Sequence, residues 1–292
     1  MGKLSVDIIE DTYLKKSAAA DNNLSILIGV DRFAYLISSA DHQVLALRVY
    51  EQENSSKPSA AGQSTSMSSF LDDVCKSDQK LNQTFARTRI GWNNRLASIV
   101  PRRLYDAANK AAYLQYLSSD KGHRDYFDDA LPKFGAHQVY AIPADWAAWR
   151  NRRFPNSQPL HISSALLNGF SAHAAATLQD GRSLFVHVGM GEVRIALLDA
   201  NSLYFSNAYT YQAAKDFLYY VLAVFNEFDL DQETTPIWLS GQLVEDSEIY
   251  RLLFRYFRKL AFMPCPPALS TGTQLSATPQ HFYTDLYFLA LP

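Results

Sequence analysis

One pattern of alternating apolar residues occurs twice in this chain of 292 residues. Residues 24–50 read LSILIGVDRFAYLISSADHQVLALRVY, and residues 183–209 read SLFVHVGMGEVRIALLDANSLYFSNAY. Each segment predicts a strand, a tight turn, a second strand, a polar turn and a third strand. The two segments align without gaps when Ala34 is placed on Val193. A three-stranded unit that repeats within one chain predicts two homologous α/β halves with a cleft between them.

The rest of the chain supplies the other elements that such halves need. We expect helices over residues 69–81, 102–118, 146–153, about 164–177, 211–228 and 246–260, and apolar residues at helical spacing indicate those at 102–118 and 211–228. We expect Asp145 to cap the third of these helices. Three strands followed by helix, strand and helix is the order of a ribonuclease-H-like domain with a mixed sheet. The predicted fold class is therefore α/β, with two ribonuclease-H-like subdomains in an actin-like arrangement.

The repeat also sets the expected domain boundaries. Residues 1–23 are a polar lead-in of uncertain structure, residues 24–165 form the first half, and residues 166–292 form the second. Extra material near residues 84–135 is expected as an insertion in the first half. Residues 280–291 form one last short element, and their pattern does not decide between helix and strand.

Composition narrows the classes of function. The 27 basic and 29 acidic residues give a formal net charge of −2, so nothing in the overall charge favours nucleic acid or an anionic membrane as a partner. Cys75 and Cys265 lie far apart in the sequence, which fits a reducing compartment. The N-terminus has no uninterrupted apolar run typical of a secretory signal, and no apolar segment is long enough to span a bilayer. We therefore expect a cytoplasmic protein.

Two stretches resemble known families. They are Ser98-Ile99-Val100-Pro101 followed by Leu104-Tyr105-Asp106, and VYAIPADWAAWRNRRFPNSQPLH over residues 139–161. Both are typical of a family of uncharacterised bacterial proteins known as a domain of unknown function. With the order of the elements, residues 24 to about 260 resemble the superfamily of actin, the sugar kinases and the heat-shock chaperone ATPases. The closer resemblance is to its bacterial pilus-assembly and secretion members.

The resemblance implies three nucleotide-binding signatures, and the chain departs from all of them. Active members carry an aspartate on the first strand of each half, which arranges magnesium and the attacking water. His187 stands at that position in the second half, and Ile28 or Leu27 in the first, depending on the alignment. With Ile28 as the counterpart, Val30 and Arg32 stand where the second half has its two turn glycines.

The glycine signatures are kept in part. The phosphate turn of the second half survives as Gly189-Met190-Gly191. Glycines there let backbone N–H groups approach an anion closely. The loop expected near adenosine reads Ser240-Gly241-Gln242, with Gln242 in place of a second glycine.

Loss of both acidic positions removes the oxygen ligands that magnesium prefers. Phosphoryl transfer depends on charge neutralisation by that metal. We therefore predict no catalytic residues, no metal, no cofactor and no binding of ATP–magnesium. Two interpretations of His187 stay open, a hydrogen-bonded core histidine or a ligand contact in the cleft. The turn of Gly189 and Gly191 is either an anion cradle or a plain hairpin.

Arginine and tryptophan gather in two stretches that could contact a partner. The residues are Arg87, Arg89, Trp92, Arg102, Arg103, Arg150, Arg152 and Arg153. Interleaved arginines and aromatics can bind nucleic acid, and the same residue types favour the centres of protein interfaces. The simplest interpretation is a solvated face with salt bridges.

Three hypotheses for the function follow. The leading one is a non-catalytic actin-like protein that acts as a scaffold through contact with a protein partner or with copies of itself. The second is a sensor or enzyme that binds a nucleotide or a small anion in a rearranged cleft. The third is binding of nucleic acid through the arginine clusters.

Overall fold

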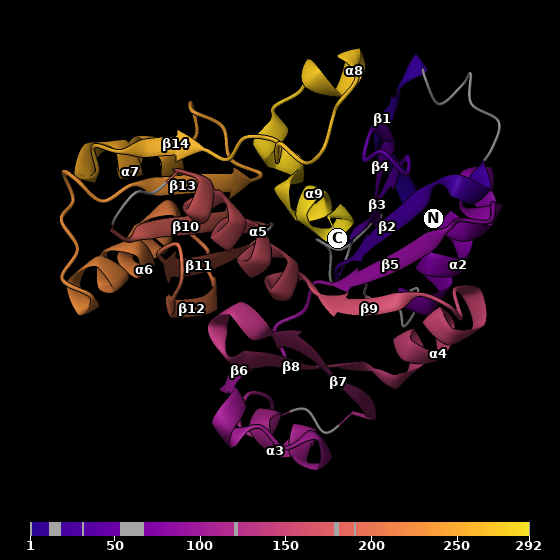
Figure 1. The fold of residues 1–292 in the computed structure, drawn as a ribbon, viewed down its shortest axis with the longest axis horizontal. Helices are drawn as coiled ribbons and strands as arrows, with labels where there is room; N and C mark the ends of the chain where they lie inside the picture. Colours follow the sequence, from indigo (N-terminus) through magenta and orange to yellow (C-terminus); the bar gives the residue numbers. More distant parts are fainter. Residues whose placement is uncertain are drawn as a thin grey trace, which may run out of the picture. The chain divides into compact units, whose positions relative to one another are not determined.

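The computed structural model describes residues 2–11, 19–30, 32–52, 67–119, 122–177, 181–189 and 191–291. The chain divides into two compact units, each built around its own sheet (Figure 1). Unit 1 comprises Met1–Ala165, Pro267–Thr278 and Leu289–Pro292. Unit 2 comprises Leu166–Pro266 and Pro279–Phe288.

Unit 1 contains a six-stranded mixed sheet. Its strands, in sheet order, are β1 (Gly2–Ile9), β4 (Val44–Gln52), β3 (Arg32–Ser38), β2 (Asn23–Ile28), β5 (Arg87–Trp92) and β9 (Gln158–His161). The first three pairings are antiparallel, and the last two are parallel. The polar lead-in, residues 1–23, contains β1, which is an edge strand of this sheet. Most of the described part of the lead-in therefore has regular structure. A short 3-10 turn, η1 (Ala19–Asp21), precedes β2.

One face of this sheet packs on helices α2 (Met67–Ser77) and α4 (Ala144–Arg153). The buried aromatic side chains Phe33, Trp92 and Trp149 belong to this core. The helix expected at residues 69–81 is confirmed as α2, followed by the 3-10 turn η2 (Gln79–Asn82). Asp145 does not cap α4: it lies inside the first turn, and its Oδ2 accepts a hydrogen bond from Ser68 Oγ at 2.9 Å.

A buried carboxylate lies at the edge of the same core. Asp78 is 3% exposed, and its Oδ2 accepts hydrogen bonds from Tyr35 Oη at 2.5 Å and Tyr50 Oη at 2.8 Å. Arg48 Nη1 lies 3.1 Å from the same oxygen, and Arg48 also pairs with Asp7 at 2.6 Å. Burial would raise the pKa of Asp78, but the hydrogen bonds from Tyr35, Tyr50 and Arg48 outweigh it and lower that pKa.

Unit 1 also contains a second, three-stranded sheet. Its strands are β6 (Ala97–Pro101), β8 (Ala136–Pro143) and β7 (Arg124–Leu131), in that order and all antiparallel. The short elements beside this sheet are η3 (Arg102–Leu104), η4 (Ala107–Asn109), α3 (Lys110–Leu114) and η5 (Pro132–Phe134).

The prediction of one helix over residues 102–118 is wrong, because only Lys110–Leu114 is α-helical in this segment. Asp106 accepts a hydrogen bond from Ala108 N at 2.9 Å and so starts a separate 3-10 turn. Tyr113 Oη donates to Leu104 O at 2.7 Å. This hydrogen bond holds the segment before η4 in a conformation that does not continue the helix. An Asp side chain that caps a turn competes in this way with helix continuation.

Unit 2 contains a five-stranded mixed sheet. Its strands, in sheet order, are β12 (Leu203–Thr210), β11 (Glu192–Leu198), β10 (Ser183–Val188), β13 (Ile237–Gly241) and β14 (Leu260–Phe262). One face packs on helices α6 (Ala214–Glu227) and α7 (Glu248–Tyr256). The other face meets α5 (Ile162–Thr177), which begins in unit 1, and α9 (Thr284–Ala290).

The repeat is visible in both hairpins. The turn between β2 and β3 is closed by a hydrogen bond from Gly29 N to Arg32 O, and the turn between β10 and β11 by one from Gly189 N to Glu192 O. Both bonds are 2.8 Å long. Gly29 is therefore the counterpart of Gly189.

The strand register then fixes the rest of the alignment. Ile28 pairs with Phe33 in unit 1, as Val188 pairs with Val193 in unit 2. Leu27 is thus the counterpart of His187, and the gapless alignment that placed Ile28 there is one residue out of register. The counterpart of Gly191 is residue 31, which lies outside the described residues.

The C-terminal segment is helical. It consists of α8 (Thr273–Ser276), η6 (Gln280–Tyr283) and α9. Within unit 1, the buried Glu10 side chain accepts hydrogen bonds from Leu275 N at 2.8 Å and Gln274 N at 3.2 Å. In the part of the chain that is described, no helix has both the length and the apolar composition to cross a bilayer.

Candidate functional site

The position of the missing aspartate in unit 2 holds a histidine fixed by two polar partners. His187 on β10 pairs in register with Ser240 on β13, so their side chains share one face of the sheet. His187 Nδ1 is hydrogen-bonded to Ser240 Oγ at 3.0 Å. His187 Nε2 lies 3.8 Å from Asp285 Oδ2 at the start of α9. Both ring nitrogens therefore face groups of this unit.

These three side chains are almost fully enclosed. His187 is 7% exposed, Ser240 0% and Asp285 3%. A serine, a histidine and an aspartate together invite comparison with a hydrolytic triad. Ser240 cannot act as its nucleophile, because a substrate carbonyl cannot reach a hydroxyl that has no exposed surface and also contacts Val186 O at 3.4 Å. Of the two interpretations of His187, the geometry fits the hydrogen-bonded core histidine.

The glycine turn beside this cluster is a closed hairpin. Gly191 has φ of +67°, the left-handed region that favours glycine. Tyr211 ties the turn down, since its Oη donates to Gly189 O at 3.0 Å and its backbone N donates to Gly191 O at 3.2 Å. No described heavy atom lies within 4 Å of a Cβ added at Gly191. The turn is therefore a hydrogen-bonded hairpin, and the space around Gly191 is open.

The third signature ends strand β13. Gly241 has φ of +82°, and a Cβ added there would lie 2.1 Å from Val188 O. Gln242 N donates to that same carbonyl at 2.8 Å, and the Gln242 side chain is exposed. Glycine at position 241 is therefore required by the backbone itself, independently of any ligand.

The corresponding place in unit 1 is apolar. Leu27 is 1% exposed, and its neighbour in register on β5 is Gly91. A Cβ added at Gly91 would lie 2.8 Å from Leu289 Cδ2, so the space beside that strand is already filled by a leucine. Leu27 and Gly91 therefore offer no side-chain ligand to a cation.

These residues do not fit a magnesium-bound triphosphate. In the described residues, no group of three or more His, Cys, Asp or Glu side chains could hold a metal ion. Asp285 is the carboxylate beside His187 that sequence reasoning missed, because the element that carries it was left undecided. A single buried carboxylate that faces an imidazole does not supply the several oxygen ligands that magnesium needs.

The structure does not bring the eight arginine and tryptophan positions together on one surface. Trp92 is fully buried and stacks on Trp146 at 6.0 Å, so it cannot contact a partner. Arg89 Nη1 donates to Leu289 O at 3.2 Å, and burial lowers the pKa of Arg89 to about 10. Arg87 donates to Gln158 Oε1 at 3.2 Å.

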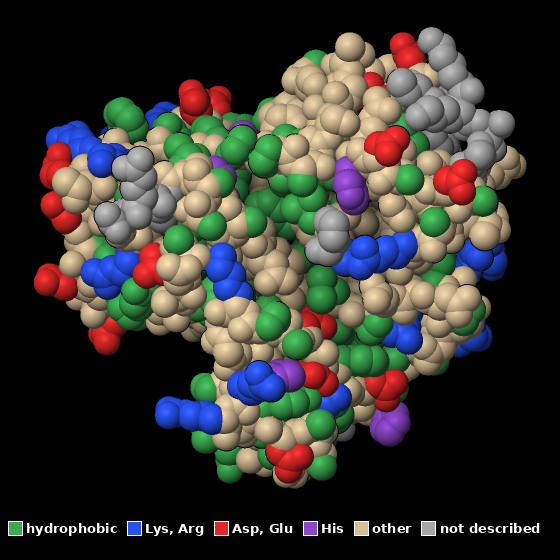
Figure 2. All heavy atoms as spheres, in the orientation of Figure 1, with side chains coloured by type: hydrophobic (Ala, Val, Ile, Leu, Met, Phe, Trp, Pro, Cys, Tyr) green, Lys and Arg blue, Asp and Glu red, His purple; other side chains and the backbone are tan. Residues whose placement is uncertain are grey.

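The remaining arginines lie in three places. Arg102 and Arg103 are exposed in η3 beside Gly135. Arg153 donates to Leu81 O at 3.3 Å, whereas Arg152 is exposed on α4. Arg150 lines a groove described below. Figure 2 shows basic side chains scattered among acidic ones over the face in view, which does not favour the hypothesis of nucleic-acid binding.

Comparisons with known proteins identify the fold. No curated protein sequence matches the chain. A solved protein from Bacteroides thetaiotaomicron, described as having an actin-like ATPase fold and unknown function, is 17% identical. It aligns with a TM-score of 0.77 over 94% of this chain and 98% of its own. A chain of the PilM–PilN type IV pilus biogenesis complex is 13% identical, with a TM-score of 0.56 over 93% of this chain and 98% of its own.

These likenesses show that the chain has the actin-like ATPase fold, as the order of its elements predicted. A family model described as "Protein of unknown function (DUF3822)" matches residues 11–260. This match covers most of the chain, so the protein belongs to the DUF3822 family of proteins of unknown function.

Proposed function

We propose that this protein is a non-catalytic member of the actin-like fold that works by contact with another protein. The observation that carries the proposal is the pair of positions that open the two halves. One is the buried Leu27, and the other is His187 held between Ser240 and Asp285. With no carboxylate at either of these two strand positions, a magnesium ion that would neutralise the charge of a triphosphate lacks its ligands.

The solved PilM chain supports the proposal that this protein works by contact with another protein. It shares the fold, and its structure is that of a complex with PilN in type IV pilus biogenesis. That protein shows that an actin-like fold can take part in a protein complex. The partner of this chain, which could also be a second copy, is proposed by analogy alone. The two cysteines, Cys75 and Cys265, are both free, which fits the cytoplasm as the place of action.

Calorimetric titration of the full chain with ATP tests the loss of nucleotide chemistry. We expect no magnesium-dependent heat and no phosphate release, because neither Leu27 nor His187 can ligate the ion. Thermal unfolding with ATP, ADP and ATP–magnesium is the second readout, since a ligand that binds only the folded state raises its apparent stability. Tight binding that requires magnesium, or turnover, would overturn the proposal.

The nucleotide-sensor hypothesis makes a different prediction in the same experiment. It requires a metal-independent rise in melting temperature with ATP or ADP that disappears when the turn is blocked. Gly191→Trp is the appropriate variant, because the surroundings of Gly191 are open and the side chain would occupy the space that an anion needs. The closed hairpin geometry gives this hypothesis no further support.

A further inference from the structure

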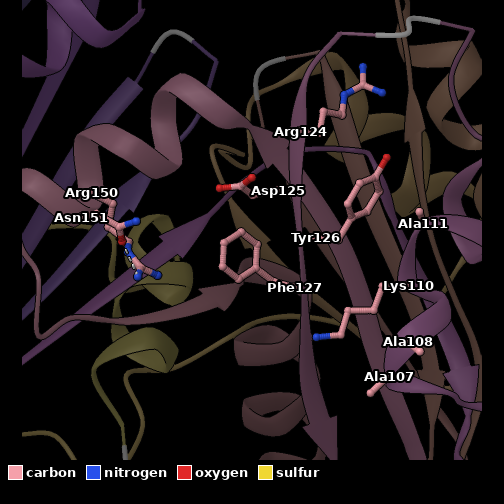
Figure 3. A pocket seen from close by; sticks show the side chains of 10 residues that line it. All are labelled: Ala107, Ala108, Lys110, Ala111, Arg124, Asp125, Tyr126, Phe127, Arg150 and Asn151. Atoms are coloured by element: carbon pink, nitrogen blue, oxygen red, sulfur yellow. Dashed lines mark hydrogen bonds between the residues drawn. The ribbon is translucent and has the colours of Figure 1, made fainter.

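A groove in unit 1 runs along the edge of the three-stranded sheet (Figure 3). Its volume is about 550 Å³. It is lined by residues of η4 and α3, of the first half of β7 and of the last turn of α4: Ala107, Ala108, Lys110, Ala111, Arg124, Asp125, Tyr126, Phe127, Arg150 and Asn151. None of these residues takes part in the nucleotide signatures.

The groove exposes the open edge of a strand. β7 pairs with β8 on one side and is the last strand of its sheet. Consecutive side chains of a strand point to opposite faces, so a groove lined by all four residues Arg124–Phe127 must follow the strand's edge. Figure 3 shows Asp125 on the side of Arg150, and Tyr126 on the side of Lys110. The unpaired backbone groups of such an edge can pair with another extended chain.

The later part of β7 is tied to another segment of unit 1 by a side chain. Asp129 of β7 accepts hydrogen bonds from His161 N at 2.7 Å and Ser164 Oγ at 2.6 Å, where α5 begins. We place the added chain along Arg124–Phe127, the part of β7 that lines the groove. Three of the other residues that line the groove, Ala107, Ala108 and Ala111, are small and exposed.

The charges that line the groove favour an acidic occupant. Lys110, Arg124 and Arg150 line it against one carboxylate, that of Asp125. Lys110 is compensated by Asp128, whose Oδ1 lies 2.6 Å from its Nζ. Arg150 makes no ion pair within the described residues: its Nη2 donates to Asn151 Oδ1 at 2.8 Å, while its Nε and Nη1 have no hydrogen-bond partner. Its guanidinium lies 5.9 Å from the centre of the Phe127 ring.

A buried N–H group without an acceptor is unfavourable, and a carboxylate is the acceptor that a guanidinium binds best. Rotation about the end of the Arg150 side chain would present its free donors to a carboxylate in the groove. We infer that this groove binds an extended acidic peptide segment of a partner protein, which adds to the edge of β7 and places a carboxylate on Arg150. The inference deepens the proposed function by naming the contact surface and the chemistry of the partner.

The test uses the full chain and a fluorescent peptide of alternating valine and aspartate, followed by polarisation and by amide NMR. We expect binding that weakens with salt, with shifts at Arg124–Phe127. A peptide with lysine in place of aspartate, and one with proline at alternate positions, should bind at least about tenfold more weakly. Failure of the acidic peptide to bind, or equal binding of either control peptide, would overturn the inference.

Paired variants locate the site. Ala111→Trp should fill the groove and abolish binding, whereas Ala112→Trp on the same helix is exposed outside the lining and should leave binding unchanged. Arg150→Gln should weaken binding about tenfold, and Arg152→Gln should not. Equal effects within either pair would place the peptide elsewhere. The result is separable from the ATP titration, because magnesium-dependent nucleotide binding would refute the proposed function and leave the groove untouched.

Discussion

Gly241→Ala is expected to destabilise unit 2 by about 3 kcal/mol or more, through backbone strain that side-chain movement cannot relieve. The φ of +82° is unfavourable for alanine, and the new Cβ would lie 2.1 Å from Val188 O and 2.9 Å from Val188 N. These atoms belong to the neighbouring strand β10, which pairs with β13 at this point. Either the pairing of the two strands opens or the end of β13 moves, and both displace Ser240 from His187.

Urea denaturation of the full chain, followed by circular dichroism, measures this effect. Gly191→Ala is the matched control, because Gly191 has φ of +67° but no described neighbour within 4 Å of the added Cβ. The control isolates the strain of a left-handed alanine, which is about 1 kcal/mol. If both variants lost the same stability, the contact with Val188 O would not matter and the geometry described for Gly241 would be wrong.

Asp78→Asn is the second large effect, with an expected loss of about 3 kcal/mol at neutral pH. The substitution keeps the shape of the side chain but removes the charge that Arg48, Tyr35 and Tyr50 surround. Asp7→Asn is the control, because Asp7 contacts the same arginine from an exposed position and should contribute less than about 1 kcal/mol.

The loss at Asp78 is also expected to depend on pH. The pKa of Asp78 is lowered in the folded protein, so the folded state binds fewer protons there than the unfolded state. The carboxylate therefore stabilises the fold above its unfolded pKa of about 4, and this contribution disappears as the pH falls through the lower folded value. Urea midpoints of wild type and Asp78→Asn should converge at acid pH. An equal difference at neutral and acid pH would contradict the assignment.

Much of the architecture was predictable because it depends on local patterns. Alternation of apolar residues identified both three-stranded units, and helical spacing identified α6. These signals arise from burial of one face, which every residue in the element reports. The edge strand β1 gave a weaker signal, because its residues Gly2–Ile9 are mostly exposed or half-buried.

The sites were harder to predict because their partners are distant in the sequence. His187 was found from its place in the repeat, but Asp285 lies far along the chain in an element whose type was undecided. Asp78 is a single aspartate after a helix, and nothing nearby marks the two tyrosines and the arginine that surround it. The groove escaped notice because a continuous helix over residues 102–118 would not have placed the alanines of η4 and α3 along β7.

The hydrogen bonds that Glu10 accepts from the backbone of Gln274 and Leu275 affect how unit 1 folds during synthesis on the ribosome. The segment Pro267–Thr278, which contacts the end of β1, is translated after nearly all of unit 2. Unit 1 therefore cannot complete its folding before most of unit 2 has been synthesised. Nascent chains stalled before residue 267 should leave β1 open to protease, and chains released at full length should protect it. Early protection of β1 would show that the strand docks stably without its late partner.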